Sequence, residues 1–265
     1  MIELSGVSYR YPGYARLALT DVDLRVADGE TVGLVGPNEA GKSTLCLVAS
    51  GLAPASIGGA LSGTVTIDGS STAGVRPHEL AGRVGIVFQN PNTQRSGVTG
   101  TVFEEVALGP VNLGLSVAES VERTRWALAT LRIEALADRD PMLLSGGQAQ
   151  LVAIASILSM RPAHLVLDEP TSQLDPEGSR LVGEALRALA YSGTSLLVAE
   201  HKVDLLDGLC DRVIALDGGR IVVDAPARIG FEADILEAIG VERPARVKIA
   251  AAFAAAGVSI PGEIG

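Results

Sequence analysis

The chain has 265 residues, a formal charge of −10 at neutral pH, and 47% hydrophobic but only 3% aromatic residues. This length suits one large domain, or one domain with a small appendix. The acidic charge disfavours non-specific nucleic-acid binding, which needs a basic surface, so we expect no nucleic-acid partner. No apolar run approaches the roughly 18–20 residues that a membrane-spanning helix needs.

The N-terminal part of the chain predicts short strands separated by turns. Strands are expected at 2–11, 21–26, 31–35, 63–69 and 84–88, and a helix at 42–52. The segment TVGLV at 31–35 is apolar throughout, which is typical of a buried parallel strand.

The part from about 95 to 160 changes to helical periodicity and predicts a helical subdomain inserted between strands. Its most regular stretch is 117–137, where Ser116 is placed as the N-cap and Glu119 follows three residues later.

Strands and helices then alternate up to about residue 225. Strands are expected at 164–168 and 194–200, helices at 176–190 and 201–210, and a hairpin at 211–224 that turns at Gly218 and Gly219. This alternation predicts an α/β fold with a mostly parallel central sheet, preceded by N-terminal antiparallel strands. Residues 226–265 predict a short C-terminal helical extension that Pro244 and Pro261 break.

The stretch GPNEAGKST at 36–44 has the spacing G-x-x-x-x-G-K-[ST] between a predicted strand and a predicted helix. Such a turn points backbone N–H groups and a helix dipole at one spot, which suits phosphate. We expect Lys42 to reach the β- and γ-phosphates and the Ser43 hydroxyl to bind Mg²⁺. An ordinary Gly-rich turn is the simpler alternative, but the strand before it and the helix after it favour the phosphate site.

Two further motifs carry chemistry. HLVLDEP at 164–170 ends a predicted strand in Asp168 and Glu169, at the edge where parallel sheets bind their ligands. Asp168 suits an outer Mg²⁺ ligand and Glu169 a base for an attacking water, although a strand end capped by acids is a structural alternative. LSGGQ at 144–148 precedes a predicted helix and offers a second anion-seeking helix N-terminus.

Six short motifs, taken in chain order, resemble those of the nucleotide-binding subunit of an ABC ATPase. They are GPNEAGKST, VFQN, LSGGQ, LVLDEP, SQLD and AEH. The resemblance runs from about residue 2 to 225 and implies a P-loop NTPase fold, ATP hydrolysis, and Mg²⁺ as the cofactor. It assigns ATP binding to Tyr11, Gly36, Pro37, Asn38, Glu39, Ala40, Gly41, Lys42, Ser43 and Thr44.

The resemblance also implies individual roles. Glu169, Gln89 and His201 would be catalytic, with Gln89 sensing Mg²⁺ and the attacking water and His201 contacting the γ-phosphate. The metal ligands would be Ser43, Gln89 and Asp168, and the Tyr11 ring would stack on adenine.

The family works as a head-to-tail dimer, in which the signature of one subunit closes over the ATP of the other. The signature residues here are Ser145, Gly146, Gly147 and Gln148. Asp175 in SQLD resembles the residue that couples the two active sites.

Two stretches, QNPNTQ at 89–94 and FEEVALGPVNLGL at 103–115, are similar to the energy-coupling-factor and cobalt-type importer ATPases, as is the tail from Gly240 to Pro261. The resemblance implies a second ATPase (identical or paralogous), a transmembrane coupling subunit that docks beside Gln89 to Gly109, and a small membrane subunit that captures substrate. It also implies a peripheral position on the cytoplasmic face of the membrane, a dimerising role for residues 226–265, and a vitamin or transition-metal ion as cargo.

Four residues depart from the family pattern, one of them Ser156, where a basic or small residue is common. The position of Glu39 is usually glycine, which implies a positive φ that costs a non-Gly residue about 1 kcal/mol. Repulsion from triphosphate predicts that this carboxylate points outward. Leu151 replaces a common arginine and Gln173 a common small residue, which implies changes in helix packing and in communication across the dimer.

Other classes of function remain open at this point. An ATPase of another ABC importer class would share the motifs. A soluble ABC ATPase of DNA repair would need long coiled coils, for which the sequence has no heptad run. A non-catalytic nucleotide-binding module would be indicated by the loss of Lys42, Glu169 or His201, and all three are present.

Overall fold

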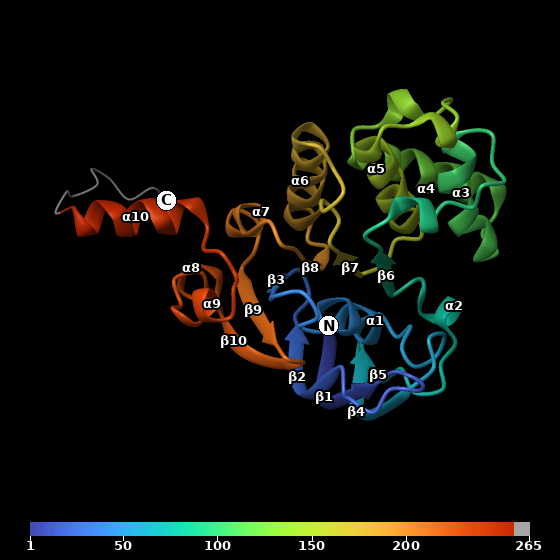
Figure 1. Ribbon diagram of the computed structural model, residues 1–265. Helices are drawn as coiled ribbons and strands as arrows, with labels where there is room; N and C mark the ends of the chain where they lie inside the picture. Colours follow the sequence, from blue (N-terminus) through green and yellow to red (C-terminus); the bar gives the residue numbers. More distant parts are fainter. Residues whose placement is uncertain (257–265) are drawn as a thin grey trace.

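Two β-sheets form the body of the protein in the computed structural model, which describes residues 1–256 (Figure 1). The N-terminal sheet is antiparallel, as predicted, and has the strand order β2-β1-β4-β5. Its strands are β1 (Ile2–Arg10), β2 (Leu19–Val26), β4 (Ala60–Ile67) and β5 (Ser70–Ser71).

The central sheet has the order β10-β9-β3-β8-β7-β6 and is parallel except for β10, so the predicted mostly parallel sheet is confirmed. Its strands are β3 (Thr31–Val35), β6 (Val84–Val87), β7 (His164–Asp168), β8 (Ser195–Ala199), β9 (Arg212–Asp217) and β10 (Arg220–Pro226). Every residue of β3, β7 and β8 is buried. The carboxyl ends of these parallel strands meet at one edge of the sheet, where their loops can build one site.

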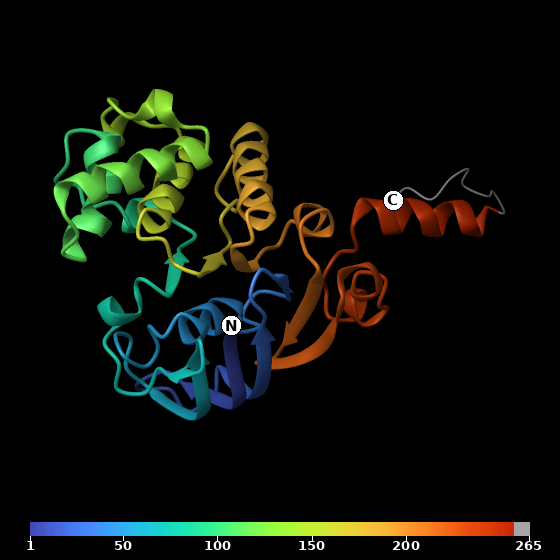
Figure 2. The same ribbon diagram turned by 180° about the vertical axis from the view of Figure 1, so that it is seen from behind.

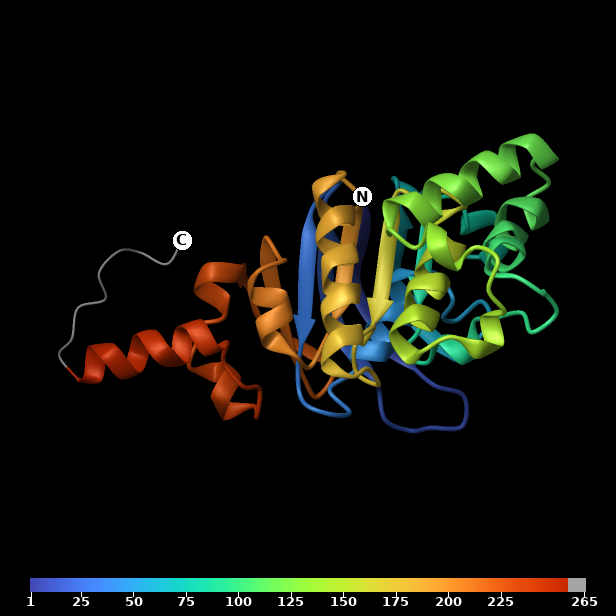
Figure 3. The ribbon, with the colours of Figure 1, turned by 90° about the horizontal axis from the view of Figure 1, so that it is seen from above.

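Both faces of the central sheet are covered. Helix α1 (Lys42–Ala49) packs between the two sheets, in one core with Val166 and Leu197. Their neighbours Leu165 and Leu196 point to the opposite face and share a second core with α6 (Pro176–Tyr191), which lies over the strands in Figure 3. Alternating side chains of each strand therefore supply both cores, as the strand period of two requires.

The helices after β6 form a separate lobe, seen beside α6 in both Figure 1 and Figure 2. The lobe contains α3 (Val102–Asn112), α4 (Val117–Thr130), α5 (Gly146–Leu158) and 3₁₀ turns at Pro91–Thr93, Glu134–Leu136 and Pro141–Leu143. The short helices α2 (Pro77–Leu80) and α7 (Val203–Asp207) precede β6 and follow β8.

Helix α4 begins as predicted but ends early. The Ser116 hydroxyl accepts the backbone N–H of Glu119 at 3.2 Å, which confirms the predicted cap. The predicted helix to residue 137 was too long, because α4 ends at Thr130 and Arg132 takes a left-handed φ of 57°. A left-handed residue cannot continue an α-helix.

The chain after β10 is helical, with α8 (Ala227–Gly230), α9 (Ile235–Ala238) and α10 (Ala245–Ala255). Pro244 directly precedes α10, so the predicted break there is confirmed, whereas Pro261 lies outside the described residues. Helix α10 projects away from the sheets in Figure 1 and Figure 3. Within residues 1–256, no helix combines the length and the apolar character that crossing a membrane requires.

Candidate functional site

A cleft of about 560 Å³ opens at the carboxyl edge of the central sheet. It brings together five segments of the chain: the loop after β1, the phosphate loop (residues 36–43), the segment after β6, the end of β7 and the β9-β10 turn. The predicted site residues that line it are Tyr11, Asn38, Glu39, Ala40, Gly41, Lys42, Ser43, Thr44, Gln89 and Glu169. The adjoining hollow of about 510 Å³ adds Gly36, Pro37 and His201.

Lys42 lies at the floor of this cleft and is only 5% exposed. Its Nζ donates hydrogen bonds to the carbonyl oxygens of Gly36 at 2.9 Å and Pro37 at 3.1 Å, and lies 3.8 Å from Oε1 of Glu169. Burial is the largest influence on the Lys42 pKa and lowers it, although the carboxylates of Glu169 and Asp168 act in the opposite direction. A bound phosphate would supply negative charge that favours the protonated form.

Two glycines allow the phosphate loop to pack closely against neighbouring backbone. A Cβ at Gly36 would lie 2.4 Å from the carbonyl oxygen of Leu216, and one at Gly41 would lie 2.8 Å from that of Ala18. Gly41 also has a φ of 106°, which side chains disfavour. The loop therefore packs directly against β9 and the start of β2.

Glu39 has a φ of 63°, so the expected left-handed backbone is confirmed. Its side chain is exposed at the rim of the cleft, and its carboxylate makes no hydrogen bond or ion pair with another residue of the described 1–256. Within residues 1–256, no hydrogen bond or ion pair of this side chain therefore offsets its backbone cost of about 1 kcal/mol.

Asp168 and Ser43 form a pair of oxygen donors beside Lys42. The Ser43 hydroxyl donates to Oδ1 of Asp168 at 3.0 Å. Burial raises the pKa of Asp168, and the charges of Glu169 and Glu200 raise it further against the opposing effects of Ser43 and Lys42. Hydroxyl and carboxylate oxygens are the ligands that Mg²⁺ prefers, and a carboxylate short of positive charge gains from one, so this pair fits the metal.

Glu169 and His201 meet across the ends of two neighbouring strands. The Glu169 carboxylate lies 2.8 Å from Nε2 of His201 and is largely buried. Glu169 takes a φ of 50° and its N–H donates to the carbonyl of Ala199, which turns its side chain out of β7 toward the cleft. His201 follows β8 and is 41% exposed, so it remains open to a ligand.

Tyr11 stands at the other end of the cleft. Its hydroxyl lies 3.1 Å from the Thr44 hydroxyl, and the rings of Tyr9 and Tyr14 contact it edge-on. The same end is lined by Arg16 and by the β9-β10 turn, neither of which we expected in the site. The position of Arg16 in the same short loop as Tyr11 was the one sequence feature that could have placed it in the site. The sequence offers no such feature for the β9-β10 turn.

The signature residues lie elsewhere in the subunit. Ser145 caps α5, with its side chain accepting the N–H of Gln148 while Gln148 bonds back to the N–H of Ser145. Gly147 lies against α6, where a Cβ would meet the Cα of Gly178 at 2.6 Å. Asp175 caps α6 by accepting the N–H of Gly178 at 2.7 Å. Within the described residues 1–256, neither the signature residues nor Asp175 line the cleft.

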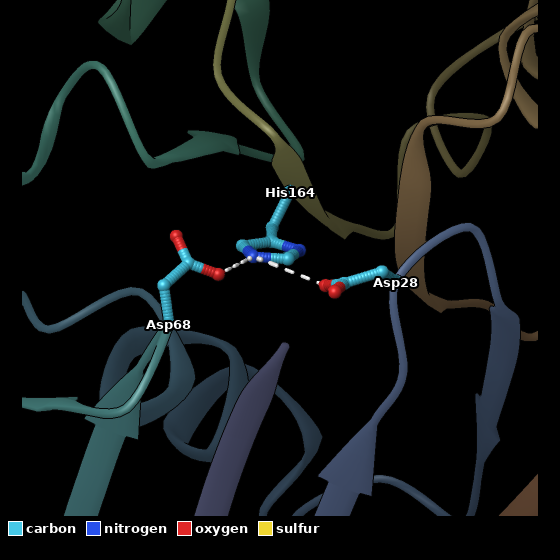
Figure 4. Close-up of side chains that lie close together, drawn as sticks. All are labelled: Asp28, Asp68 and His164. Carbon is cyan, nitrogen blue, oxygen red and sulfur yellow. Dashed lines mark hydrogen bonds and ion pairs between the residues drawn. The ribbon is translucent and has the colours of Figure 1, made fainter.

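A second group of potential metal ligands lies at the opposite, amino edge of the sheet (Figure 4). Nε2 of buried His164 lies 2.8 Å from Asp68 and 4.0 Å from Asp28. The ammonium of Met1 bonds to both carboxylates and lies 2.9 Å from the same nitrogen. This cluster already contains a cation and ties the turns after β2 and β4 to β7, so we assign it a structural role.

A family model described as ABC transporter matches residues 19–172, more than half of the chain. The chain belongs to the ABC transporter family. The energy-coupling factor transporter ATP-binding protein EcfA1 of Halalkalibacterium halodurans is 37% identical over 263 residues, which cover 98% of this chain and 92% of the relative.

Two solved structures are similar to most of the chain. CbiO1 of Clostridium perfringens, part of an ABC transporter complex, superimposes with a TM-score of 0.78 at 28% identity over 94% of this chain and 98% of its own. A dimeric cassette bound to ADP and phosphate gives a TM-score of 0.73 at 28% identity over 86% and 99% of the two chains. The predicted P-loop ATPase fold is confirmed, and the protein is an ABC ATPase.

Replacing Glu39 by glycine tests the cost of the acid in the phosphate loop. We predict that Glu39→Gly binds ATP as tightly as the unchanged ATPase or more tightly, because it removes a left-handed side chain worth about 1 kcal/mol and a carboxylate near triphosphate. Calorimetric titration with ATP measures the affinity. Glu39→Gln is the matched control, since it removes the charge but keeps the strain. An affinity loss above about tenfold, or 1.4 kcal/mol, in Glu39→Gly would show that the acid is needed.

Proposed function

We propose that this ABC ATPase binds Mg²⁺ and ATP in the cleft and hydrolyses the nucleotide to power a membrane importer of the energy-coupling-factor type. One observation carries the catalytic part: the Glu169 carboxylate lies 2.8 Å from His201 and 3.8 Å from Lys42, so three separate motifs converge on one carboxylate. The likeness to EcfA1 over nearly the whole chain supports the transporter class. An ATPase of another ABC importer class is the alternative.

In this proposal the phosphate loop holds the triphosphate through its backbone N–H groups and the Lys42 ammonium. Ser43 and Asp168, with Gln89 at the rim of the same cleft, would hold Mg²⁺. The metal, when bound, neutralises charge that develops on the phosphate oxygens. Tyr11 would receive the adenine at the far end of the cleft.

Glu169 would orient the attacking water and accept its proton. The water oxygen forms a bond to the γ-phosphorus, the bond to the β,γ-bridging oxygen breaks, and ADP leaves with that electron pair. His201 would exchange its contact with Glu169 for one with the γ-phosphate. Hydrolysis would then be coupled to the position of the loop that follows β8.

The site would be completed by a second ATPase subunit, identical or paralogous. The capped N-terminus of α5 at Ser145 is exposed and does not contribute to the cleft of its own subunit. A head-to-tail dimer would bring Ser145, Gly146, Gly147 and Gln148 of each subunit over the ATP of the other. The dimeric state of the solved cassette with ADP and phosphate supports this arrangement.

The membrane partners would be a transmembrane coupling subunit and a small substrate-capture subunit, with the ATPase peripheral on the cytoplasmic face. The likeness to CbiO1, itself part of an ABC transporter complex, supports this assembly. Between Gln89 and Gly109, where the coupling subunit would dock, Val98 is 82% exposed. The cargo would be a vitamin or a transition-metal ion, recognised by another chain.

The C-terminal extension would help to hold the two ATPases together. Its base is fixed: the Ala245 N–H donates to Asp204, and Arg246 pairs with Asp207, both on α7. Ile249 is 50% and Phe253 42% exposed. They are four residues apart, so they share one face of α10 that a second extension could cover.

Glu169→Gln tests the catalytic part of the proposal. We predict that hydrolysis falls by about 100-fold or more, since general base catalysis contributes about 10²–10⁴-fold, while ATP affinity is retained. Phosphate release measures the rate. Glu122→Gln on the exposed side of α4 is the control, and hydrolysis intact in Glu169→Gln would mean that another group acts as the base.

Purification of a tagged chain from detergent-solubilised membranes tests the assembly. We expect integral membrane subunits and a second ATPase to copurify, and the double variant Ile249→Asp, Phe253→Asp to recover less of that ATPase. Ala251→Asp is the control, because a residue two positions away lies on the other side of the helix. Recovery of DNA-bound proteins alone would contradict the transporter assignment, and equal recovery with the double variant would contradict the role of α10.

A further inference from the structure

All three polar groups of Thr171 are bound by the two residues that flank His201. Its N–H and its hydroxyl both donate to Oε1 of Glu200, at 2.9 and 2.6 Å. Its carbonyl oxygen accepts from Nζ of Lys202 at 2.9 Å. Thr171 is fully buried and lies two residues after Glu169. The loop that carries Glu169 is therefore hydrogen-bonded to the residues on both sides of His201.

Glu200 also holds its own loop. Its second oxygen, Oε2, accepts the backbone N–H groups of His201 at 3.0 Å and Lys202 at 3.3 Å. The carboxylate is 1% exposed and its two oxygens accept four hydrogen bonds, two from each loop. A buried charge is tolerated when it is hydrogen-bonded in this way, and each such bond is stronger than one between neutral groups.

The contacts continue toward the surface expected to face the second ATPase. Nζ of Lys202 also donates to Oγ of Ser179 at 2.7 Å. Ser179 lies on α6, the helix whose N-terminus Asp175 caps. On the other side, the N–H and the hydroxyl of Ser172 donate to the carbonyl of Glu169. The segment from Glu169 to Asp175 is therefore joined to the loop that carries His201 at Glu169 and at Thr171, and Ser172 stabilises the turn between these contacts and Asp175.

We propose that Glu200 and Lys202 are positioning residues that make the loop from Glu169 to Asp175 and the loop of His201 move as one unit. This rests on the proposed function, in which His201 contacts the γ-phosphate and Asp175 faces the second subunit. Movement of His201 on ATP binding would then be transmitted through Thr171 to the catalytic carboxylate and to the dimer surface. The two side chains need not touch ATP to do this.

Glu200→Gln tests the proposal with little change in volume. An amide has one oxygen and one NH₂ group, and the NH₂ cannot accept the N–H donors that point at it, so one of the two loops loses its acceptor. Lys202→Met removes the bond to the Thr171 carbonyl, and Thr171→Val removes only the hydroxyl. Lys248→Met, at an exposed lysine on α10, is the matched control.

Hydrogen exchange of the backbone amides, measured with and without Mg²⁺ and ATP, tests whether the two loops respond to ATP together. In the unchanged protein and in Lys248→Met, ATP should slow exchange in both 169–175 and 201–203. In Glu200→Gln and Lys202→Met, we expect protection at 201–203 to remain and protection at 169–175 to be lost, with a smaller loss in Thr171→Val. The kcat should fall by about tenfold or more in the first two variants while the KM for ATP changes by less than about threefold.

Three results would overturn the coupling. In the first, ATP protects 169–175 in Glu200→Gln and Lys202→Met as it does in the control. In the second, ATP protects only one of the two segments, or neither, in the unchanged protein. Alternatively, ATP affinity, kcat and thermal stability could all fall together in every variant, including Thr171→Val, as a purely structural role requires. Hydrolysis that survives Glu169→Gln would instead contradict the proposed function, and that result is independent of the exchange pattern.

Discussion

The site depends on the parallel register of three buried strands. In the central sheet β3 pairs with β8 and β8 with β7, so Leu34, Ala199 and Asp168 end side by side. The loops that follow these three strands, which carry Lys42, His201 and Glu169, therefore leave the sheet from adjacent positions. No long-range loop has to be ordered to bring Lys42, His201 and Glu169 together, because the backbone hydrogen bonds of the sheet already do so.

This edge of the sheet carries a buried cationic group and a buried anionic group, each suited to a ligand of the opposite charge. Lys42 is buried with a lowered pKa and turns back to the carbonyls of its own loop, while Asp168 is buried with a raised pKa. Burial disfavours the charged form of each side chain, and a ligand of opposite charge would stabilise that form. Under the proposed function, triphosphate would stabilise the charged lysine and Mg²⁺ the charged aspartate, so that one cleft would serve both.

Much of this site follows from local rules. A strand, a Gly-rich turn and a helix define the phosphate loop, so the roles expected of Gly36, Gly41 and Lys42 follow from the spacing alone. The left-handed backbone at Glu39 was predictable from the family pattern. Ser116 was recognisable as a cap because capping depends on neighbouring residues.

The features that sequence reasoning missed depend on distant contacts. Arg16 and the turn at Gly218–Gly219 reach the cleft only because the antiparallel sheet and β9 are packed beside the phosphate loop. The acceptor role of Glu200 needs Thr171, which is 29 residues away in the chain. The early end of α4 was missed for a different, local reason: Arg132 takes a left-handed backbone although the apolar period continues beyond it.

The most direct test of this account is the contribution of Lys42 to the binding of polyphosphate. Calorimetric titration would compare the unchanged protein with Lys42→Met, using ATP with Mg²⁺ and, as the control ligand, AMP. We predict that Lys42→Met loses about 100-fold in affinity for ATP, since removing one partner of a buried charge pair costs about 2–5 kcal/mol, and little for AMP. Equal ATP affinity in the two proteins would contradict the assignment of the cleft as the nucleotide site.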